Sequence, residues 1–258
     1  MRLYLRYFSI HARSLMQYKT SFFLTVFGQF ITSFTGFLAV WFMMDRYHEV
    51  QGFDFREVSL CFAVMLMAFS LAECFARGFD TFPSMLGNGE FDRIMTRPRG
   101  LIFQVLAQKV ELSRLGRLAQ ATLIFVWAIP ASGVVWTPDK IFTLVMMISG
   151  GIVVFSGLFI VYASLCFFTT DGLEFMNIFT DGGREFGRFP FSIYGDGILR
   201  FLTYAIPLAL FQYYPLLYLT GRSGSLLYMF TPALGCLFIV PCYLLWRLGL
   251  RHYKSTGS

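Results

Sequence analysis

The chain has 258 residues, of which 56% are hydrophobic and 14% are charged, and its mean hydropathy is +0.61. A soluble domain carries about 25% charged residues, so this composition excludes an ordinary soluble protein and indicates one embedded in a lipid bilayer. The formal net charge of +6 does not indicate nucleic-acid binding, because the basic residues flank apolar runs and form no single polar face.

Residues 1–19 are predicted to form a helix that lies on the membrane surface. On a helical wheel the polar positions form one narrow stripe, and the rest of the circumference is apolar or aromatic. A basic stripe opposite an apolar face suits a helix between anionic head groups and acyl chains. The stripe consists of Arg2, Arg6, Ser9, Arg13 and Gln17.

Six apolar segments follow, and each is long enough to cross a bilayer at about 1.5 Å per residue. The fourth is long for a simple crossing, which predicts a tilted helix or one that extends beyond the bilayer. The fold class predicted is therefore an all-α polytopic membrane protein. The predicted spans are Thr20–Met44, Val58–Ala76, Leu118–Trp136, Ile141–Thr170, Phe201–Thr220 and Ser223–Trp246.

A polar stretch, Arg77–Arg117, separates the second and third predicted spans and carries seven basic and four acidic residues. Such a segment cannot lie in hydrocarbon. Six spans place both termini on one side, where the connecting segments hold seventeen basic residues against four on the other side. The positive-inside rule then predicts that both termini, Arg77–Arg117 and the polar stretch Asp171–Arg200 face the cytoplasm.

No catalytic residues and no metal site are predicted. The sequence has no cluster of histidines and acids at ligand spacing, no Gly-x-Ser-x-Gly turn and no phosphate-binding loop of the Gly-x-x-x-x-Gly-Lys-Ser/Thr type. The five cysteines lie singly within apolar runs, which indicates small buried side chains and no disulfide framework. If ATP drives this protein, another polypeptide must supply the ATPase.

A few charged and polar residues near the span ends are candidates for function. Glu73 and Arg77 stand four residues apart, the favourable order for an ion pair, so Glu73 is either a functional intramembrane acid or the partner of Arg77. Glu174 and Asn177 follow the fourth span, where gating and a simple interfacial position are both open. A solvated helical extension of the third span is predicted to carry Lys109, Glu111, Arg114 and Arg117.

Aromatic residues make up 19% of the chain and recur at helical spacing along the first and fourth spans. Packing between helices or against lipid explains most such stripes, and an aromatic-lined path for a hydrophobic or amphipathic substrate is the alternative. The candidate path residues are Phe34, Phe37, Trp41, Phe155 and Phe159.

The order of these parts resembles the membrane subunits of bacterial ATP-binding-cassette (ABC) exporters of the second type, and most of all a compact subfamily of about 260 residues. Three stretches carry the resemblance, together with one departure, the pair Phe167–Phe168 where a Phe-Trp pair is expected. The stretches are GNGEFDRIMTRPRG (87–100), SLCFFTTDGLEFMN (164–177) and FPFSIYGDGILRFLTYAIPLALFQYYPLLYLTG (189–221).

The resemblance implies an N-terminal elbow helix, six spans and a short coupling helix between spans two and three. It implies a permease of the bacterial cytoplasmic (inner) membrane with no ATPase of its own. Two identical or similar permeases would pair and dock on cytoplasmic ABC ATPase subunits, which bind the ATP and Mg²⁺. Contact with the ATPase would fall on Gly87, Asn88, Gly89, Glu90, Phe91, Asp92 and Arg93.

The residues of this coupling segment suit such a contact. Asn88 or Gly89 can cap a short helix, and Phe91 can fill an apolar groove of the partner while the neighbouring charges fix its register. Proline at position 98 disfavours helix in the residue before it, so the element is predicted to end near Arg97.

The leading hypothesis is an exporter permease that moves a hydrophobic or amphipathic compound, such as a drug, a lipid-like molecule or a peptide. The alternative is an ion-coupled secondary transporter in which Glu73 carries a proton or ion. A membrane-bound enzyme would need a polar catalytic cluster, which the sequence lacks.

Overall fold

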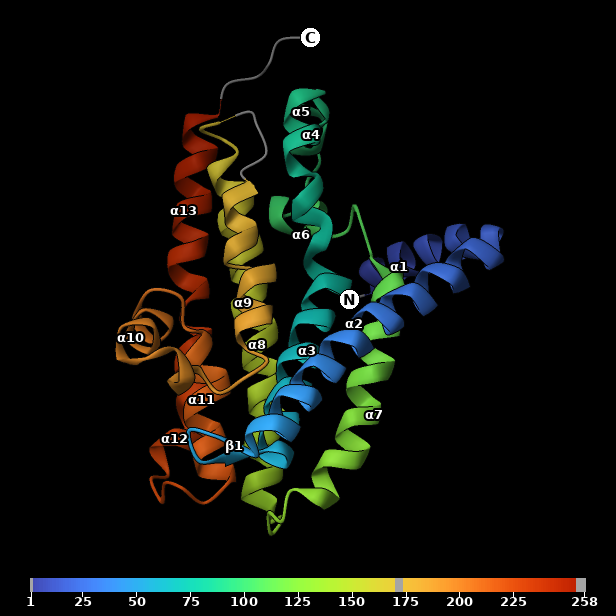
Figure 1. Ribbon diagram of the computed structural model, residues 1–258. Helices are drawn as coiled ribbons and strands as arrows, with labels where there is room; N and C mark the ends of the chain where they lie inside the picture. The colour runs from blue at the N-terminus through green and yellow to red at the C-terminus, as the bar shows by residue number, and fades with distance from the viewer. Residues whose placement is uncertain (1, 170–173, 254–258) are drawn as a thin grey trace.

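The computed structural model describes residues 2–169 and 174–253, the first five of these by backbone only (Figure 1). Met1, Thr170 and the centre of the 164–177 stretch therefore lie outside the described residues, as do the side chains of Arg2 and Arg6. The described chain is a bundle of helices with one short β-hairpin.

The N-terminus forms a helical hairpin. Helix α1 (Arg2–Leu15) passes through a 3₁₀ turn, η1 (Met16–Tyr18), into the long helix α2 (Lys19–Tyr47), which crosses the bundle obliquely (Figure 1). His11 Nε2 lies 3.2 Å from the carbonyl oxygen of Ala107, so α1 is tied to the segment before α7. A small cluster around Phe22, Val110 and Leu112 packs beneath it.

The hairpin of β1 (Glu49–Val50) and β2 (Phe53–Asp54) leads into α3 (Phe55–Ala76). A capping box starts α3: the Asp54 carboxylate accepts from the Glu57 amide at 2.8 Å, and the Glu57 carboxylate accepts from the Asp54 amide at 3.1 Å. These bonds satisfy amide groups that have no partner within the helix. Helix α3 is the centre of the bundle, and nearly all of its side chains are buried.

Two helices flank α3. Helix α7 (Leu115–Ala131) follows a 3₁₀ turn, η3 (Leu112–Arg114), and is the predicted third span. It ends five residues before the predicted boundary because the chain turns back there, and the Trp136 indole donates to the Ile129 carbonyl at 3.0 Å. Helix α8 (Pro138–Leu165) begins three residues before the predicted fourth span, with proline in its first turn, where no amide donor is needed.

The predicted fifth span is interrupted at the first of its two prolines, and the second, Pro215, lies inside a helix. The chain forms α10 (Asp196–Tyr204) and α11 (Leu208–Leu219), separated by Ala205–Pro207. Proline at 207 has no amide hydrogen with which to continue the hydrogen-bond ladder, so the helix stops before it.

The predicted sixth span is nearly continuous. It contains α12 (Leu227–Cys236) and α13 (Ile239–His252), with a break at Leu237–Phe238, the carbonyl region that Pro241 leaves without a donor. Among the described residues, four helical stretches are long and apolar enough to cross a membrane: Tyr7–Tyr47, Phe55–Gly87, Pro138–Leu165 and Leu227–His252. The predicted count of six spans is thus supported for these four, while α7 and the α10–α11 pair are shorter.

Short helices complete the fold at one end and in the interior. At one end, α3 continues through η2 (Arg77–Thr81) into α4 (Phe82–Gly87) and α5 (Glu90–Met95), at the top of Figure 1, and α6 (Leu101–Leu106) lies below them. Helix α9 (Asp181–Phe186) lies beside α8; η4 (Glu174–Ile178) precedes it, and η5 (Phe191–Tyr194), which contacts α10 and α11, follows it.

The polar stretch Asp171–Arg200, which is predicted to face the cytoplasm, packs into the bundle in its central part. Phe191 is fully buried, and the Gln212 side chain of α11 donates to the carbonyls of Gly187 at 3.2 Å and Phe189 at 2.9 Å. A Cβ at Gly187 would overlap the Met65 side chain of α3, so the segment lies directly against α3 here. The segment therefore enters the bundle between α3 and α11.

Candidate functional site

A buried carboxylate, Glu73, lies where α3, η3 and α7 meet. Its side chain is fully buried and forms ion pairs with Arg77, with Arg117 at 2.6 Å and with Arg114 at 3.4 Å. The predicted pair with Arg77 is confirmed. Two further arginines share the carboxylate, so Glu73 joins three elements.

The predicted solvated helical extension of the third span is wrong in two respects. Arg117 does lie on α7, which begins at Leu115, but it is only 9% exposed because it turns inward to Glu73. Lys109 and Glu111 lie outside the helices, in the segment before η3, and pair at 2.6 Å. Partial burial acts to raise the pKa of the Glu111 carboxyl, but hydrogen bonding and the charge of Lys109 outweigh it, and that pKa lies below its ordinary value.

Besides the group around Glu73, a second group of charged side chains lies on α9 and just after it. Arg77 also pairs with Asp80. On α9, Arg184 pairs with Glu185 at 2.7 Å and with Asp181 at 3.7 Å, and Glu185 also holds Arg188. We call this set the charged network; its members are Glu73, Arg77, Asp80, Arg114, Arg117, Asp181, Arg184, Glu185 and Arg188.

Two arginines of the network lie among apolar helices. The Arg184 guanidinium lies over the Phe69 ring of α3, 5.1 Å from its centroid. Arg188 lies against α2, where a Cβ at Gly36 would come within 2.8 Å of its guanidinium. Gly36 thus leaves room for a charged group near the middle of α2. Charged residues at such depth are rare and are associated with function.

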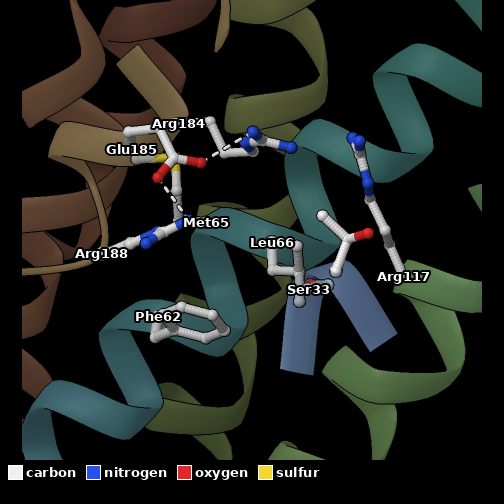
Figure 2. Close-up of a pocket in the computed structure, with 9 residues that line it drawn as sticks. Ser33, Phe62, Met65, Leu66, Arg117, Arg184, Glu185 and Arg188 are labelled. Atoms are coloured by element: carbon white, nitrogen blue, oxygen red, sulfur yellow. Dashed lines mark hydrogen bonds and ion pairs between the residues drawn. The ribbon is translucent and has the colours of Figure 1, made fainter. Parts of the chain in front are cut away.

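A pocket of about 60 Å³ opens between α2, α3, α7 and α9, and Figure 2 shows the side chains around it. Its polar lining consists mainly of three arginines and one glutamate of the charged network, and its apolar lining comes from α3. The lining residues are Thr32, Ser33, Phe62, Met65, Leu66, Arg117, Arg184, Glu185 and Arg188.

The sequence reasoning missed the α9 residues of this site. Local hydropathy places Arg184, Glu185 and Arg188 only in a polar stretch between two spans. A usable signal is the spacing of opposite charges three apart, Asp181 with Arg184 and Glu185 with Arg188, which can pair on one helix face. Within the described part of the chain no group of three histidine, cysteine or acidic residues could hold a metal ion.

A second polar pocket, of about 170 Å³, adjoins the network at the end of α3. Asn177, one of the predicted gating candidates, lines it together with Arg77, Asp80 and Asp181. Glu174 begins η4 and is exposed; it does not line this pocket. The structure thus brings Asn177, but not Glu174, to the charged network.

The predicted coupling segment forms two short helices. Gly89 is the N-cap of α5, as predicted, and has φ of +68°, a left-handed conformation that favours glycine. Helix α5 ends at Met95, before the Arg97-Pro98-Arg99 run. Exposed side chains between residues 88 and 99 are those of Asn88, Glu90, Arg93, Met95, Thr96, Arg97, Pro98 and Arg99.

The hypothesis that the Phe91 side chain fills a partner's groove is corrected by its burial. Phe91 is fully buried and packs edge-to-face on Phe82, Phe167 and Tyr253, with Trp246 nearby. The Tyr253 hydroxyl donates to Asp92 at 3.0 Å. Burial and this bond raise the pKa of Tyr253 to about 12. Phe91 therefore fastens α5 to α13 within its own chain.

Replacing Phe91 with alanine is accordingly expected to destabilise the fold by about 3–5 kcal/mol, the usual cost of removing a buried aromatic side chain. The measurement is thermal unfolding of the purified variant in detergent, with exposed Met95→Ala on the same helix as the matched control. If Phe91→Ala were as stable as the control, this would contradict the burial of Phe91 and favour its contact with a partner.

The predicted aromatic path residues divide into two groups. Phe155 and Phe159 are buried and pack on Phe69, and Phe159 also lines the pocket of about 170 Å³ at the end of α3. Phe34 is 41% exposed on the outer face of α2. Phe37 and Trp41 line a shallow aromatic groove with Phe55 and Trp127. The structure therefore does not join the five residues into one path.

A family profile described as "ABC-2 family transporter protein" matches residues 30–257 of the chain. The matched range runs from α2 through α13, so it includes the charged network, the pocket and the α4–α6 segment. No curated protein and no solved structure matches the chain.

Proposed function

The chain belongs to the ABC-2 family of transporters, and from this membership we propose that it is the permease of an ATP-driven exporter of a hydrophobic or amphipathic compound. Membership makes it a membrane subunit that works with ATPase subunits. The further parts of the proposal are that this chain hydrolyses no ATP, that ATP and Mg²⁺ are bound by the partner, and that transport is outward.

The proposed orientation places α4–α6 and both termini in the cytoplasm of the bacterial inner membrane. Charge supports it: leaving out the arginines of Asp171–Arg200, part of which lies inside the bundle, fourteen basic residues remain on the proposed cytoplasmic side against four opposite. The bond between Tyr253 and Asp92 supports it too, because it joins the end of α13 to α5 at one end of the bundle.

The observation that carries the ATPase contact is the exposed basic surface of α5 and the residues after it. Arg93, Arg97 and Arg99 are exposed, with Glu90 the one acidic side chain exposed among the described residues 87–100. Below this surface, Phe91 and Ile94 are buried against the core that includes α13. A surface fastened in this way can transmit a rigid-body push from a partner into the spans. Pairing with a second, identical or similar permease is part of the proposal.

Arg93→Glu is expected to weaken association with the cognate ATPase by about tenfold, or about 1.4 kcal/mol, because a reversed charge faces a surface complementary to arginine. Coexpression and co-purification of the two proteins, followed by measurement of their dissociation constant, tests this. Arg46→Glu, exposed at the far end of α2, is the matched control. Equal affinity of the two variants would contradict an ATPase contact at α5.

The proposal of export is tested by ATP-dependent uptake into inverted vesicles that contain the chain and its ATPase. Substrate movement that persists with a catalytically dead ATPase would favour the secondary transporter instead. The pairing of Glu73 with three arginines supports the exporter, because an ion carrier must release its contacts in every cycle.

A further inference from the structure

The pocket of Figure 2 combines cationic and apolar side chains. Arg184 of α9 and Arg188 just after it lie on one side and Arg117 of α7 lies on the other, and Phe62, Met65 and Leu66 come from α3 between them. A volume of about 60 Å³ is several times what one water molecule needs. The pocket can therefore receive both a charged group and apolar carbon.

The charged network around the pocket is one negative charge short. It contains five arginines and four carboxylates in two ion-paired groups, one around Glu73 and one at α9. With every group ionised, its net charge is +1. An uncompensated charge among apolar helices is costly, so a single bound anion would stabilise the assembly.

The α9 group is balanced, with two arginines against Asp181 and Glu185, and the Glu73 group carries the excess charge, which Arg117 brings to the pocket. Of the network residues that line the pocket, three are arginines and one, Glu185, is acidic. The Nε of Arg184 is buried and has no hydrogen-bond partner among the described residues. A buried donor without an acceptor costs free energy, and an anionic oxygen would supply the acceptor.

Access to the pocket is from the side of α2. Only four residues of α2 are buried, so this helix contacts the bundle along one narrow face; they are Phe22, Gly36, Val40 and Met44. Thr32 lines the pocket and is itself exposed. A molecule in the bilayer can thus place its head group at the arginines while its chain stays against α2 and α3.

We propose that this pocket binds one anionic head group, a phosphate or carboxylate, carried by an amphipathic molecule. Arg117, Arg184 and Arg188 hold the head group, and Phe62 and Leu66 contact the first part of the apolar chain. As a substrate site the pocket rests on the proposed export function, whereas binding itself does not. The molecule is either a lipid of the membrane or the exported compound.

The test uses the full chain in nanodiscs of phosphatidylcholine, titrated with decyl phosphate, decyl phosphocholine or inorganic phosphate. Decyl phosphate is expected to raise the unfolding temperature and to bind about tenfold or more tightly than the other two, because only it offers both an uncompensated anion and a chain. Equal binding of decyl phosphocholine would overturn the anionic site, and equal binding of inorganic phosphate would overturn the amphipathic ligand.

Two variants place the binding in this pocket. Arg188→Gln is expected to weaken decyl phosphate binding by about tenfold or more, and Ser33→Leu is expected to do the same by filling the pocket without changing any charge. Arg251→Gln, an exposed arginine at the end of α13, is the matched control. Unchanged affinity in a folded Ser33→Leu protein would overturn the site even if Arg188→Gln fails to fold.

The two sources of the ligand are separated by native mass spectrometry of the chain from its own membrane. An anionic phospholipid retained by the wild-type chain and lost from Ser33→Leu identifies a bound lipid. If the chain from its own membrane carries no lipid and still binds added decyl phosphate, the ligand of the pocket is the exported compound and not a membrane lipid. Failure of ATP-dependent transport with binding intact would count against the proposed function and leave the pocket standing.

Discussion

Replacing Glu73 with glutamine is expected to lower the free energy of unfolding by about 3–5 kcal/mol, because it removes one partner of a buried ionic network. Glu73 is the single acid that Arg114 and Arg117 share in the described structure, and Arg77 pairs with it as well. Glutamine keeps the size of the side chain and removes its charge. The arginines would then repel one another in a site from which water is largely excluded.

Thermal and denaturant unfolding of the purified chain, in one detergent, measures this effect. Glu90→Gln on the exposed surface of α5 is the control for loss of an acid and should change stability by less than about 0.5 kcal/mol. If Glu73→Gln were as stable as Glu90→Gln, Glu73 would not be a structural member of the network. The hypothesis that Glu73 carries a proton or ion would then be favoured.

Gly116→Ala is expected to be the most damaging of the small substitutions. Gly116 is in the first turn of α7, and a Cβ there would overlap the backbone carbonyl oxygen of Val26 and lie 2.9 Å from the amide of Phe30, both in α2. Backbone atoms cannot move aside as side chains do, so α2 and α7 would have to separate. We expect a loss of about 3 kcal/mol, at the upper end of the usual cost of overpacking.

Gly28→Ala is the matched control, because Gly28 lies on α2 beside the same crossing and a Cβ there would meet nothing within 4 Å. Alanine is a better helix former than glycine, so this variant should be neutral or slightly stabilising. The measurement is the unfolding temperature of both variants. Equal unfolding temperatures would show that α2 is not held against α7 at Gly116 in solution.

The membrane class and most of the long helices could be predicted because hydropathy is a local property. A window of apolar residues in α2, α3 or α8 has no stable place in water wherever the rest of the chain lies. The polar α4–α6 segment and the turn at Gly89 follow from local chemistry in the same way. The ends of these helices shifted by a few residues because prolines and caps, not hydropathy, decide where a helix stops.

Position relative to distant elements could not be predicted from local patterns. The local sequence predicts that Phe91 lies on an exposed helix, but Phe91 is buried because α13 packs against it with Trp246 and Tyr253. Arg117 reads as a solvated charge until α3 brings Glu73 to within 2.6 Å. In both cases a partner far along the chain changes the environment without changing the local sequence.

The sequence alone therefore determined that this is a helical membrane protein, where its main apolar helices run and which transporter family it resembles. The tertiary structure decided that α9 enters the bundle, that Glu73 is shared by three arginines and that a cationic pocket lies beside α2. The physical reason is that charges can satisfy one another across elements, so a segment that looks fit only for water can be buried once its partners are assembled.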